Sequence, residues 1–402
     1  MNNFIKNFIS YVGNVLFFFN KKDIKKENIK KILIISLYFR GDVLFNTVAI
    51  KMLNKIFRDA LIDVLVKSRS KEVLEGSPYI NKLIVFDDIK TADYNDSSKI
   101  KLKEKFLLIK KIRNENYDLC IDFTGKYSTA LFTLLGGFKY STGLNYNGFG
   151  FCYSKFVNID TQNTAGHLTE KYLHVVKEGL GIDVNEWAEL KKNFTDNCEI
   201  YINEPEIKVA AKQLDKLYIH KERPLVCIQV TAGWKAKELS ENNFTALIKK
   251  LISSEYSFIL IGSDEDKEIN YRILDAAGSD LRKYYLNLPL KVNAAVIRLS
   301  DVFIGSDSIG LHLAGALGTP SVGLFGPTNP TFSNPAGDKH LIIYHQLFCS
   351  APDNHQYCTR DAGKSCPTID CMKLIHTEEI FKKIEFLLRK YSRQKQMLFE
   401  KN

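Results

Sequence analysis

The sequence predicts an α/β fold with two Rossmann-like halves that face each other across a cleft. Short apolar runs, which suit buried parallel strands, alternate with helical segments after Lys31 and again after Pro224. The length of 402 residues is enough for about two domains. Because strands that alternate with helices build a parallel sheet, we expect one such sheet in each half.

The first half begins with a buried strand that follows a lysine-rich segment, and Gly41-Asp42 ends the apolar run. Amphipathic and charged segments separate its later apolar runs. A helix over 167–180 ends at Gly181, a residue typical of a helix C-cap. The other predicted elements are strands at 31–36, 62–66, 83–86 and 119–123, and helices at 43–56, 100–116 and 126–136.

The second half repeats this alternation after a polar stretch, 183–222, which we predict to be an irregular linker. Its predicted elements are strands at 225–230, 258–261, 285–286, 302–304 and 322–325, and helices at 241–253, 266–277, 293–299, 311–317 and 377–391. The predicted divisions are an N-terminal extension (1–30), a first domain (31–182), the linker (183–222), a second domain (223–376) and a C-terminal helix and tail (377–402).

The net charge of +10 points to an anionic partner. Nucleic acid, an anionic membrane surface and a phosphorylated substrate would each explain it. The sequence contains no zinc-finger pattern, no RNA-binding aromatic signature and no single long basic run, so we expect no nucleic acid.

Residues 4–19 are apolar and aromatic, but Lys6 and Asn7 interrupt them and no small-residue cleavage site follows. The stretch is too short for a transmembrane helix. It is either a helix packed on the protein or an interfacial anchor, because apolar side chains recur at helical spacing before a group of lysines. The residues concerned are Phe4, Phe8, Tyr11, Val15 and Phe18, followed by Lys21, Lys22, Lys25 and Lys26.

Four of the eight cysteines gather towards the C-terminal end. Their spacing contains no C-x-x-C pair, so the zinc signal is weak. We expect a reduced structural loop, with metal binding as the alternative and disulfides disfavoured in a reducing compartment. The four are Cys349, Cys358, Cys366 and Cys371.

The loop over 38–43 joins the first strand to its helix, and we expect it to face the cleft. Asp42 either caps the helix, which stabilises it by about 1 kcal/mol, or acts as a general base that takes a proton from an acceptor hydroxyl. Spacing alone leaves both interpretations open. Gly41 allows a substrate to approach the backbone closely.

The segment 301–330 predicts a strand end, a ligand-binding turn, a short helix and a second strand. Its turn, Gly305–Ser308, places small hydroxyl side chains and a carboxylate where the helix begins. A helix N-terminus at the carboxyl edge of a parallel sheet is a natural phosphate site. His312, one turn beyond Asp307, is either a structural histidine or a phosphate contact.

Two other loops carry charged residues at strand ends. Lys237 is either a solvated loop charge or the cation that neutralises a diphosphate leaving group. Asp264 either contacts ribose hydroxyls or caps a turn. Asp264 and Asp266 have the spacing of a metal-binding pair, but no metal is needed if a lysine and helix dipoles hold the diphosphate.

The sequence has no G-x-G-x-x-G after the first strand and no Walker lysine. These absences count against a nicotinamide or flavin enzyme and against a P-loop hydrolase. No Ser-His-Asp arrangement can be drawn. We therefore predict no metal site and no required cofactor, and a divalent cation has no supporting motif.

Taken together, these residues resemble glycosyltransferase family 9, the ADP-heptose:lipopolysaccharide heptosyltransferases. The resemblance runs from about Lys31 to Ile380 and is strongest over Asp307–Pro330. Arg40–Val43 resembles the opening motif of the family, and Ile121–Gly125 resembles its acceptor-side loop. The cysteines that end at Cys371-Met372 also look familial.

The resemblance implies a GT-B fold and an inverting transfer of heptose from ADP-heptose. It implies that Asp42 is the base, that Lys237 contacts the diphosphate and that Asp264 lies near the ribose. The implied acceptor is the anionic lipid A-linked inner core of lipopolysaccharide, at the cytoplasmic face of the inner membrane, where we expect peripheral contact. The implied donor-binding residues are Thr231, Lys237, Asp264, Asp307, Ser308, Ile309, Gly310 and His312, and the acceptor-binding residues are Arg40, Gly41, Arg69 and Lys126, with Lys67 nearby.

The sequence departs from the family pattern because Ile309 separates the hydroxyl residue from Gly310. Another nucleotide sugar or another acceptor therefore stays open. A non-catalytic scaffold that binds a nucleotide or glycolipid is the alternative from a different class. The presence of both Asp42 and Lys237 argues against the scaffold.

Overall fold

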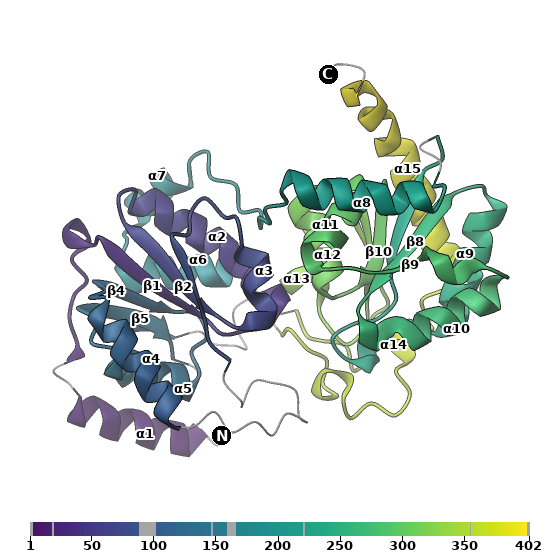
Figure 1. Ribbon diagram of the computed structural model, residues 1–402. Coiled ribbons are helices and arrows are strands. Elements are labelled where there is room, and N and C mark those ends of the chain that lie inside the picture. Colours follow the sequence, from purple (N-terminus) through teal and green to yellow (C-terminus); the bar gives the residue numbers. More distant parts are fainter. Residues whose placement is uncertain are drawn as a thin grey trace. The chain divides into compact units, whose positions relative to one another are not determined.

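The computed structural model describes residues 3–17, 20–87, 102–145, 148–158, 166–219, 222–353 and 355–399. The chain divides into two units, each built around a six-stranded parallel sheet (Figure 1). The first unit comprises Met1–Thr164 and Leu168–Tyr201, and the second comprises Ala165–His167 and Ile202–Asn402. The predicted α/β class, with one parallel sheet in each half, is confirmed.

The first sheet has the strand order β3-β2-β1-β4-β5-β6. Strand β1 (Lys31–Ser36), in the interior of this sheet, is fully buried after Lys31. Its apolar side chains suit a strand that is covered on both faces of the sheet. β5 and β6 were not predicted, since they are short and carry polar residues instead of an apolar run. The strands are β1 (Lys31–Ser36), β2 (Leu61–Val66), β3 (Lys82–Val85), β4 (Leu119–Asp122), β5 (Tyr140–Leu144) and β6 (Lys155–Val157).

Helices cover both faces of this sheet. Leu33 and Ile35 of β1 pack with Ile112 of the charged helix α4, while α2 packs against α6. Gly181 directly follows α6 with φ of 68°, as predicted for a C-cap glycine. None of the helices in the described ranges is long and apolar enough to cross a bilayer. The helices are α1 (Asn3–Leu16), α2 (Arg40–Ile56), α3 (Lys71–Leu74), α4 (Leu102–Asn114), α5 (Tyr127–Leu135), α6 (Leu168–Leu180) and α7 (Val184–Lys191).

The second sheet has the order β12-β11-β10-β7-β8-β9. Its strands are β7 (Leu225–Gln229), β8 (Ser257–Gly262), β9 (Tyr285–Asn287), β10 (Val302–Ser306), β11 (Ser321–Phe325) and β12 (His340–Tyr344). β12 was not predicted. The helices are α8 (Glu204–Lys216), α9 (Glu241–Ser253), α10 (Lys267–Ala277), α11 (Leu290–Leu299), α12 (Ile309–Leu317), α13 (Pro330–Ser333), α14 (Asp370–Lys373) and α15 (Thr377–Phe399).

The prediction that residues 183–222 are irregular was wrong, because this stretch contains α7 and α8. The carboxylate of Asp183 caps α7 by accepting the N–H groups of Asn185 and Glu186. α8 packs on α11 and buries only Ala210 and Leu214. A helix with such a narrow buried stripe has a polar sequence that is easily taken for a linker. The predicted domain divisions themselves stay a prediction.

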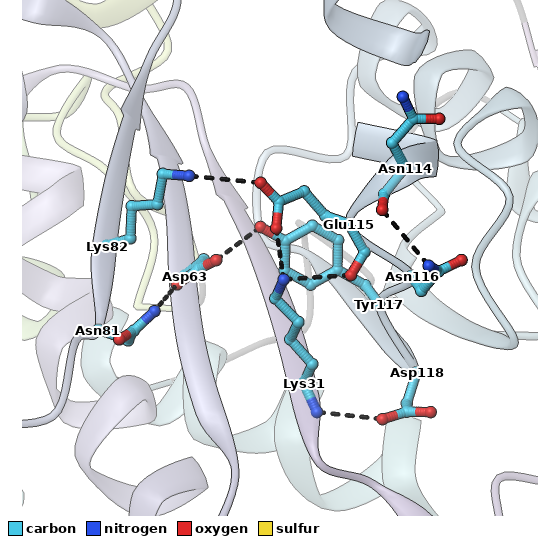
Figure 2. Close-up of polar contacts among 9 residues, drawn as sticks. All are labelled: Lys31, Asp63, Asn81, Lys82, Asn114, Glu115, Asn116, Tyr117 and Asp118. Carbon is cyan, nitrogen blue, oxygen red and sulfur yellow. Dashed lines mark hydrogen bonds and ion pairs between the residues drawn. The ribbon is translucent and has the colours of Figure 1, made fainter. Parts of the chain in front are cut away.

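A polar network lies near the amino ends of the strands in the first sheet (Figure 2). Nζ of Lys31 donates to the carbonyl of Glu115 at 3.1 Å and to its carboxylate at 2.5 Å. Asp63 accepts the Tyr117 hydroxyl at 2.6 Å and the Asn81 amide at 2.7 Å. Because ligands of parallel α/β sheets bind at the carboxyl ends of the strands, we assign this network to the stability of the fold.

A half-buried histidine in the second unit, His340, should make the stability of the protein depend on pH. Burial, assisted by the charge of Lys339, lowers the pKa of His340 from 6.5 to about 4. The unfolded chain takes up this proton near its ordinary pKa, whereas the folded protein does not. The free energy of unfolding should therefore fall as the pH drops from about 6.5 to about 4, by up to roughly 3 kcal/mol.

Urea unfolding of the wild type and of His340→Asn at pH 7, 5.5 and 4.5 measures this contribution. The variant should lose less stability than the wild type over this range. It should keep part of the slope, because burial also lowers the pKa of His167 to about 4. Identical slopes in the two proteins would contradict the assignment to His340.

Candidate functional site

The carboxyl ends of β7 and β10 lie side by side in the second sheet, where Gly305 pairs with Gln229. Asp307 and Ser308 follow β10 and precede α12. A 3₁₀ turn, Lys235–Lys237, follows β7. The sheet therefore brings together two segments that are far apart in the sequence and that were each predicted to contact phosphate.

A buried ion pair joins these two segments. Nζ of Lys237 donates to Oδ2 of Asp307 at 2.7 Å and to its carbonyl at 2.8 Å. The two side chains are only 10% and 8% exposed. The Trp234 ring lies against the ammonium, with Nζ 3.9 Å from the ring centroid, a cation–π contact. The alternative that Lys237 is a solvated loop charge is wrong.

Asp307 has further polar partners. The Ser333 hydroxyl donates to its Oδ1 at 2.8 Å, and Nε2 of His312 lies 3.4 Å from the same oxygen. Burial acts to raise the pKa of Asp307, but the charge of Lys237 and the His312 contact hold this pKa well below its ordinary value. Asp307 is therefore ionised and holds the ammonium of Lys237 in place.

Gln229 belongs to this site, although the sequence analysis did not select it. Its Oε1 accepts the Ser308 hydroxyl and the N–H of Gly310, both at 3.1 Å. A Cβ at Gly310 would lie 2.2 Å from this oxygen and 2.7 Å from the ring of Phe303. Only glycine fits there without displacing a neighbour. Half-buried Ile309 is the first residue of α12.

Two predicted donor residues lie elsewhere along this edge. Thr231 is buried two residues beyond β7. Asp264 is exposed at the end of β8 and accepts a hydrogen bond from the amide of Asn287. The nearby turn is capped by Asp266, which accepts the N–H of Ser263 at 2.7 Å. The roles of Thr231 and Asp264 stay predictions.

Basic side chains surround an exposed aromatic ring at the carboxyl edge of the first sheet. Cζ of Arg69 lies 4.3 Å from the centroid of the Phe39 ring, and Nζ of buried Lys67 lies 5.4 Å from it. Nε of Arg40 donates to the carbonyl of Arg69 at 2.7 Å. The predicted acceptor residues Arg40 and Arg69 are thus neighbours. We call Arg40, Lys67, Arg69 and Lys126 the basic cluster.

The loop after β4 brings Lys126 to the same edge of the sheet. Its Nζ lies 5.8 Å from the centroid of the Tyr38 ring, and the Tyr38 hydroxyl donates to the carbonyl of Thr124 at 2.7 Å. Fully buried Asp122 accepts the N–H of Thr124 and the hydroxyl of Tyr153, both at 2.8 Å. Burial raises the pKa of Asp122. These contacts define the shape of the loop that carries Lys126.

Asp42 is the third residue of α2 and is half-buried. The N-cap position belongs to Phe39, so the alternative that Asp42 is the N-cap residue is wrong. A carboxylate in the first turn of a helix still interacts favourably with the helix dipole. Gly41, between Arg40 and Asp42, is also half-buried and part of α2.

The four C-terminal cysteines line one small pocket together with Gly326 and Pro327. All four are free thiols. The loop that carries them contacts the Lys237 turn, because Nε1 of Trp234 donates to the carbonyl of Ala362 at 3.0 Å. Over the described part of the chain, no group of three or more His, Cys, Asp or Glu side chains is placed to hold a metal ion.

Comparisons with known proteins identify relatives of this chain. The model of glycosyltransferase family 9 (heptosyltransferase) matches residues 106–362. Lipopolysaccharide heptosyltransferase 3 of Escherichia coli K12 is 26% identical, covering 79% of this chain and 89% of that protein.

Two solved structures share the fold. The family 9 glycosyltransferase of Veillonella parvula has a TM-score of 0.76 at 19% identity, covering 92% of this chain and 100% of that one. ADP-heptose lipopolysaccharide heptosyltransferase II of E. coli has a TM-score of 0.72 at 20% identity, covering 90% and 99%. The predicted GT-B fold is confirmed.

Proposed function

Because the chain belongs to glycosyltransferase family 9, we propose that it transfers heptose from ADP-heptose to the lipid A-linked inner core of lipopolysaccharide. The proposed reaction is a direct displacement that inverts the anomeric carbon. The observation that carries the proposal is the buried pair of Lys237 and Asp307 beside the first turn of α12.

In this proposal the donor diphosphate binds at the N-terminus of α12. The N–H groups of a first helical turn and the helix dipole attract phosphate. As the bond from heptose to the diphosphate breaks, negative charge develops on the departing ADP. Lys237, held in place by Asp307, stabilises that charge without having to reorganise. The other proposed donor contacts are Thr231, Asp264, Asp307, Ser308, Ile309, Gly310 and His312.

The acceptor is proposed to bind at the carboxyl edge of the first sheet. Arginine forms strong paired hydrogen bonds with carboxylates and phosphates, so the basic cluster suits an anionic inner core. Arg40, Gly41, Arg69 and Lys126 are the proposed acceptor contacts. Asp42 follows Arg40 and Gly41 in the first turn of α2 and would take the proton from the attacking hydroxyl.

No cofactor is proposed, because Lys237 and the first turn of α12 can supply the positive charge that the leaving group needs. The proposed site of action is the cytoplasmic face of the inner membrane, where the glycolipid acceptor is presented. No nucleic-acid partner is proposed.

A second candidate keeps the fold and the mechanism but uses a different nucleotide sugar. It is favoured by the departure from the family pattern in the first turn of α12, where Ile309 separates Ser308 from Gly310 and the N–H of Gly310 is already bonded to Gln229. A turn with this N–H engaged offers the donor fewer backbone donors.

Calorimetry of the purified protein with ADP-heptose, UDP-glucose and GDP-mannose tests the donor. We expect binding of ADP-heptose alone and its loss in Lys237→Ala. Preference for another nucleotide sugar would favour the second candidate. Binding of none of the three would contradict both candidates and favour the non-catalytic scaffold.

A further inference from the structure

One side of α1 is packed on the first unit. Gly13 is buried against Phe151, whose ring a Cβ at that position would meet at 2.1 Å. The Phe17 ring, just beyond the helix, stacks on Phe151 with 5.5 Å between centroids. Nζ of Lys21 then donates to the carbonyls of Gly150 and Tyr153 at 3.1 and 3.2 Å. α1 is therefore held in a defined orientation on this unit.

The other side of α1 is apolar and exposed. Its exposed side chains follow helical spacing, and Tyr11 is 72% exposed. The interpretation of a packed helix thus holds for one side of α1, while the interfacial anchor stays a prediction that the exposed apolar side allows. Phe18 lies outside the described residues, as does the side chain of Phe4. The exposed residues are Phe8, Tyr11, Val12, Val15 and Leu16.

α5 carries a second exposed apolar stripe, formed by Tyr127, Leu131 and Leu135 at four-residue spacing. α5 and α1 pack on the same hydrophobic cluster around Phe151. A chain of ring contacts links the two helices, from Tyr127 to Phe149 at 6.3 Å and from Phe149 to Phe151 at 5.7 Å. In Figure 1 both helices lie at the same end of the first unit.

We propose that the stripes of α1 and α5 form one docking face for the surface of an anionic lipid bilayer. Exposed Lys22 and Lys25 follow α1, and the backbone N–H of Lys22 donates to Ser154 beside the same cluster. Aromatic and aliphatic side chains next to lysines match the interface between acyl chains and anionic headgroups. A second copy of the chain fits less well, because a two-fold contact would bring the same lysines together.

The docking face and the basic cluster are adjacent in the sequence. Lys126, which belongs to that cluster, directly precedes Tyr127 at the start of α5. Docking of the α5 stripe would therefore bring Lys126 to the level of the lipid headgroups. This consequence rests on the proposed glycolipid acceptor, whereas the docking itself does not.

Flotation with vesicles of phosphatidylcholine alone, and with added phosphatidylglycerol, tests the docking without donor or acceptor. We expect the wild type to float with the anionic vesicles. Phe8→Ser/Tyr11→Ser/Val15→Ser and, separately, Leu131→Ser/Leu135→Ser should each bind at least about tenfold more weakly. Lys22→Gln/Lys25→Gln should weaken binding to anionic vesicles by roughly fivefold per lysine.

Val184→Ser is the matched control, since Val184 on α7 of the same unit is also 72% exposed. It should float like the wild type. The proposal is overturned if the wild type stays unbound, or if both serine variants bind as it does. Light scattering that shows a dimer broken by these variants would identify the face as a subunit contact instead. None of these outcomes depends on heptose transfer, so failure of the docking and failure of the proposed reaction are separate results.

Discussion

Lys237→Ala should lower kcat/KM by about 10²–10³-fold, because it removes the fixed cation proposed to stabilise the departing diphosphate. It should also destabilise the fold. The Lys237 ammonium is 2.7 Å from Asp307, and both side chains are about nine-tenths buried. Removing one partner leaves the other charge buried and uncompensated, which typically costs about 3–5 kcal/mol.

A double variant, Lys237→Met/Asp307→Asn, separates these two effects. It removes both charges, so it should recover much of the stability that Lys237→Ala loses. Its transfer rate should stay low, because the cation is still missing. Urea unfolding and steady-state kinetics measure the two quantities. Recovery of activity together with stability would show that Lys237 acts only through the fold.

Asp42→Asn should lower kcat by about 10²–10⁴-fold, the usual contribution of a general base. Its effect on stability should be small, because asparagine keeps the size and shape of the side chain and Phe39, not Asp42, is the N-cap residue. Loss of a favourable interaction with the helix dipole costs roughly 0.3–1 kcal/mol. Donor affinity should not change, since the proposed donor residues all belong to the second unit.

Kinetics, calorimetry with ADP-heptose and urea unfolding together test this prediction. Asp59→Asn is the control, because Asp59 is an exposed carboxylate of the same unit shortly after α2. It should behave like the wild type. An Asp42→Asn enzyme with full kcat would rule out Asp42 as the base, and full complementation of a null strain by it would favour the scaffold.

The strands that the sequence predicted well are those buried on both faces. β1, β7, β10 and β11 each contain an apolar run, and a parallel strand covered by helices on both sides needs one. β5 carries polar residues, and β12 is an edge strand in which only Ile343 is buried; both were missed. Their strand conformation depends on pairing with a neighbouring strand, which local composition does not reveal.

The candidate site shows the same division. Asp307 and Ser308 were predicted at a strand end because glycine and small polar residues interrupt an apolar run there. The partners of these residues were not predictable. Gln229 is 79 positions from Ser308, and Ser333 is 26 positions from Asp307.

The sequence by itself determined the alternation of elements, the two sheets and the segments that carry the charged residues, because these follow from local spacing and composition. Only the tertiary structure decided that Lys237 is a buried partner of Asp307, that Asp42 is not the N-cap residue, and that α1 has one packed and one exposed side. Burial and ion pairing arise from contacts between segments far apart in the chain, and such contacts exist only once the unit that contains them has folded.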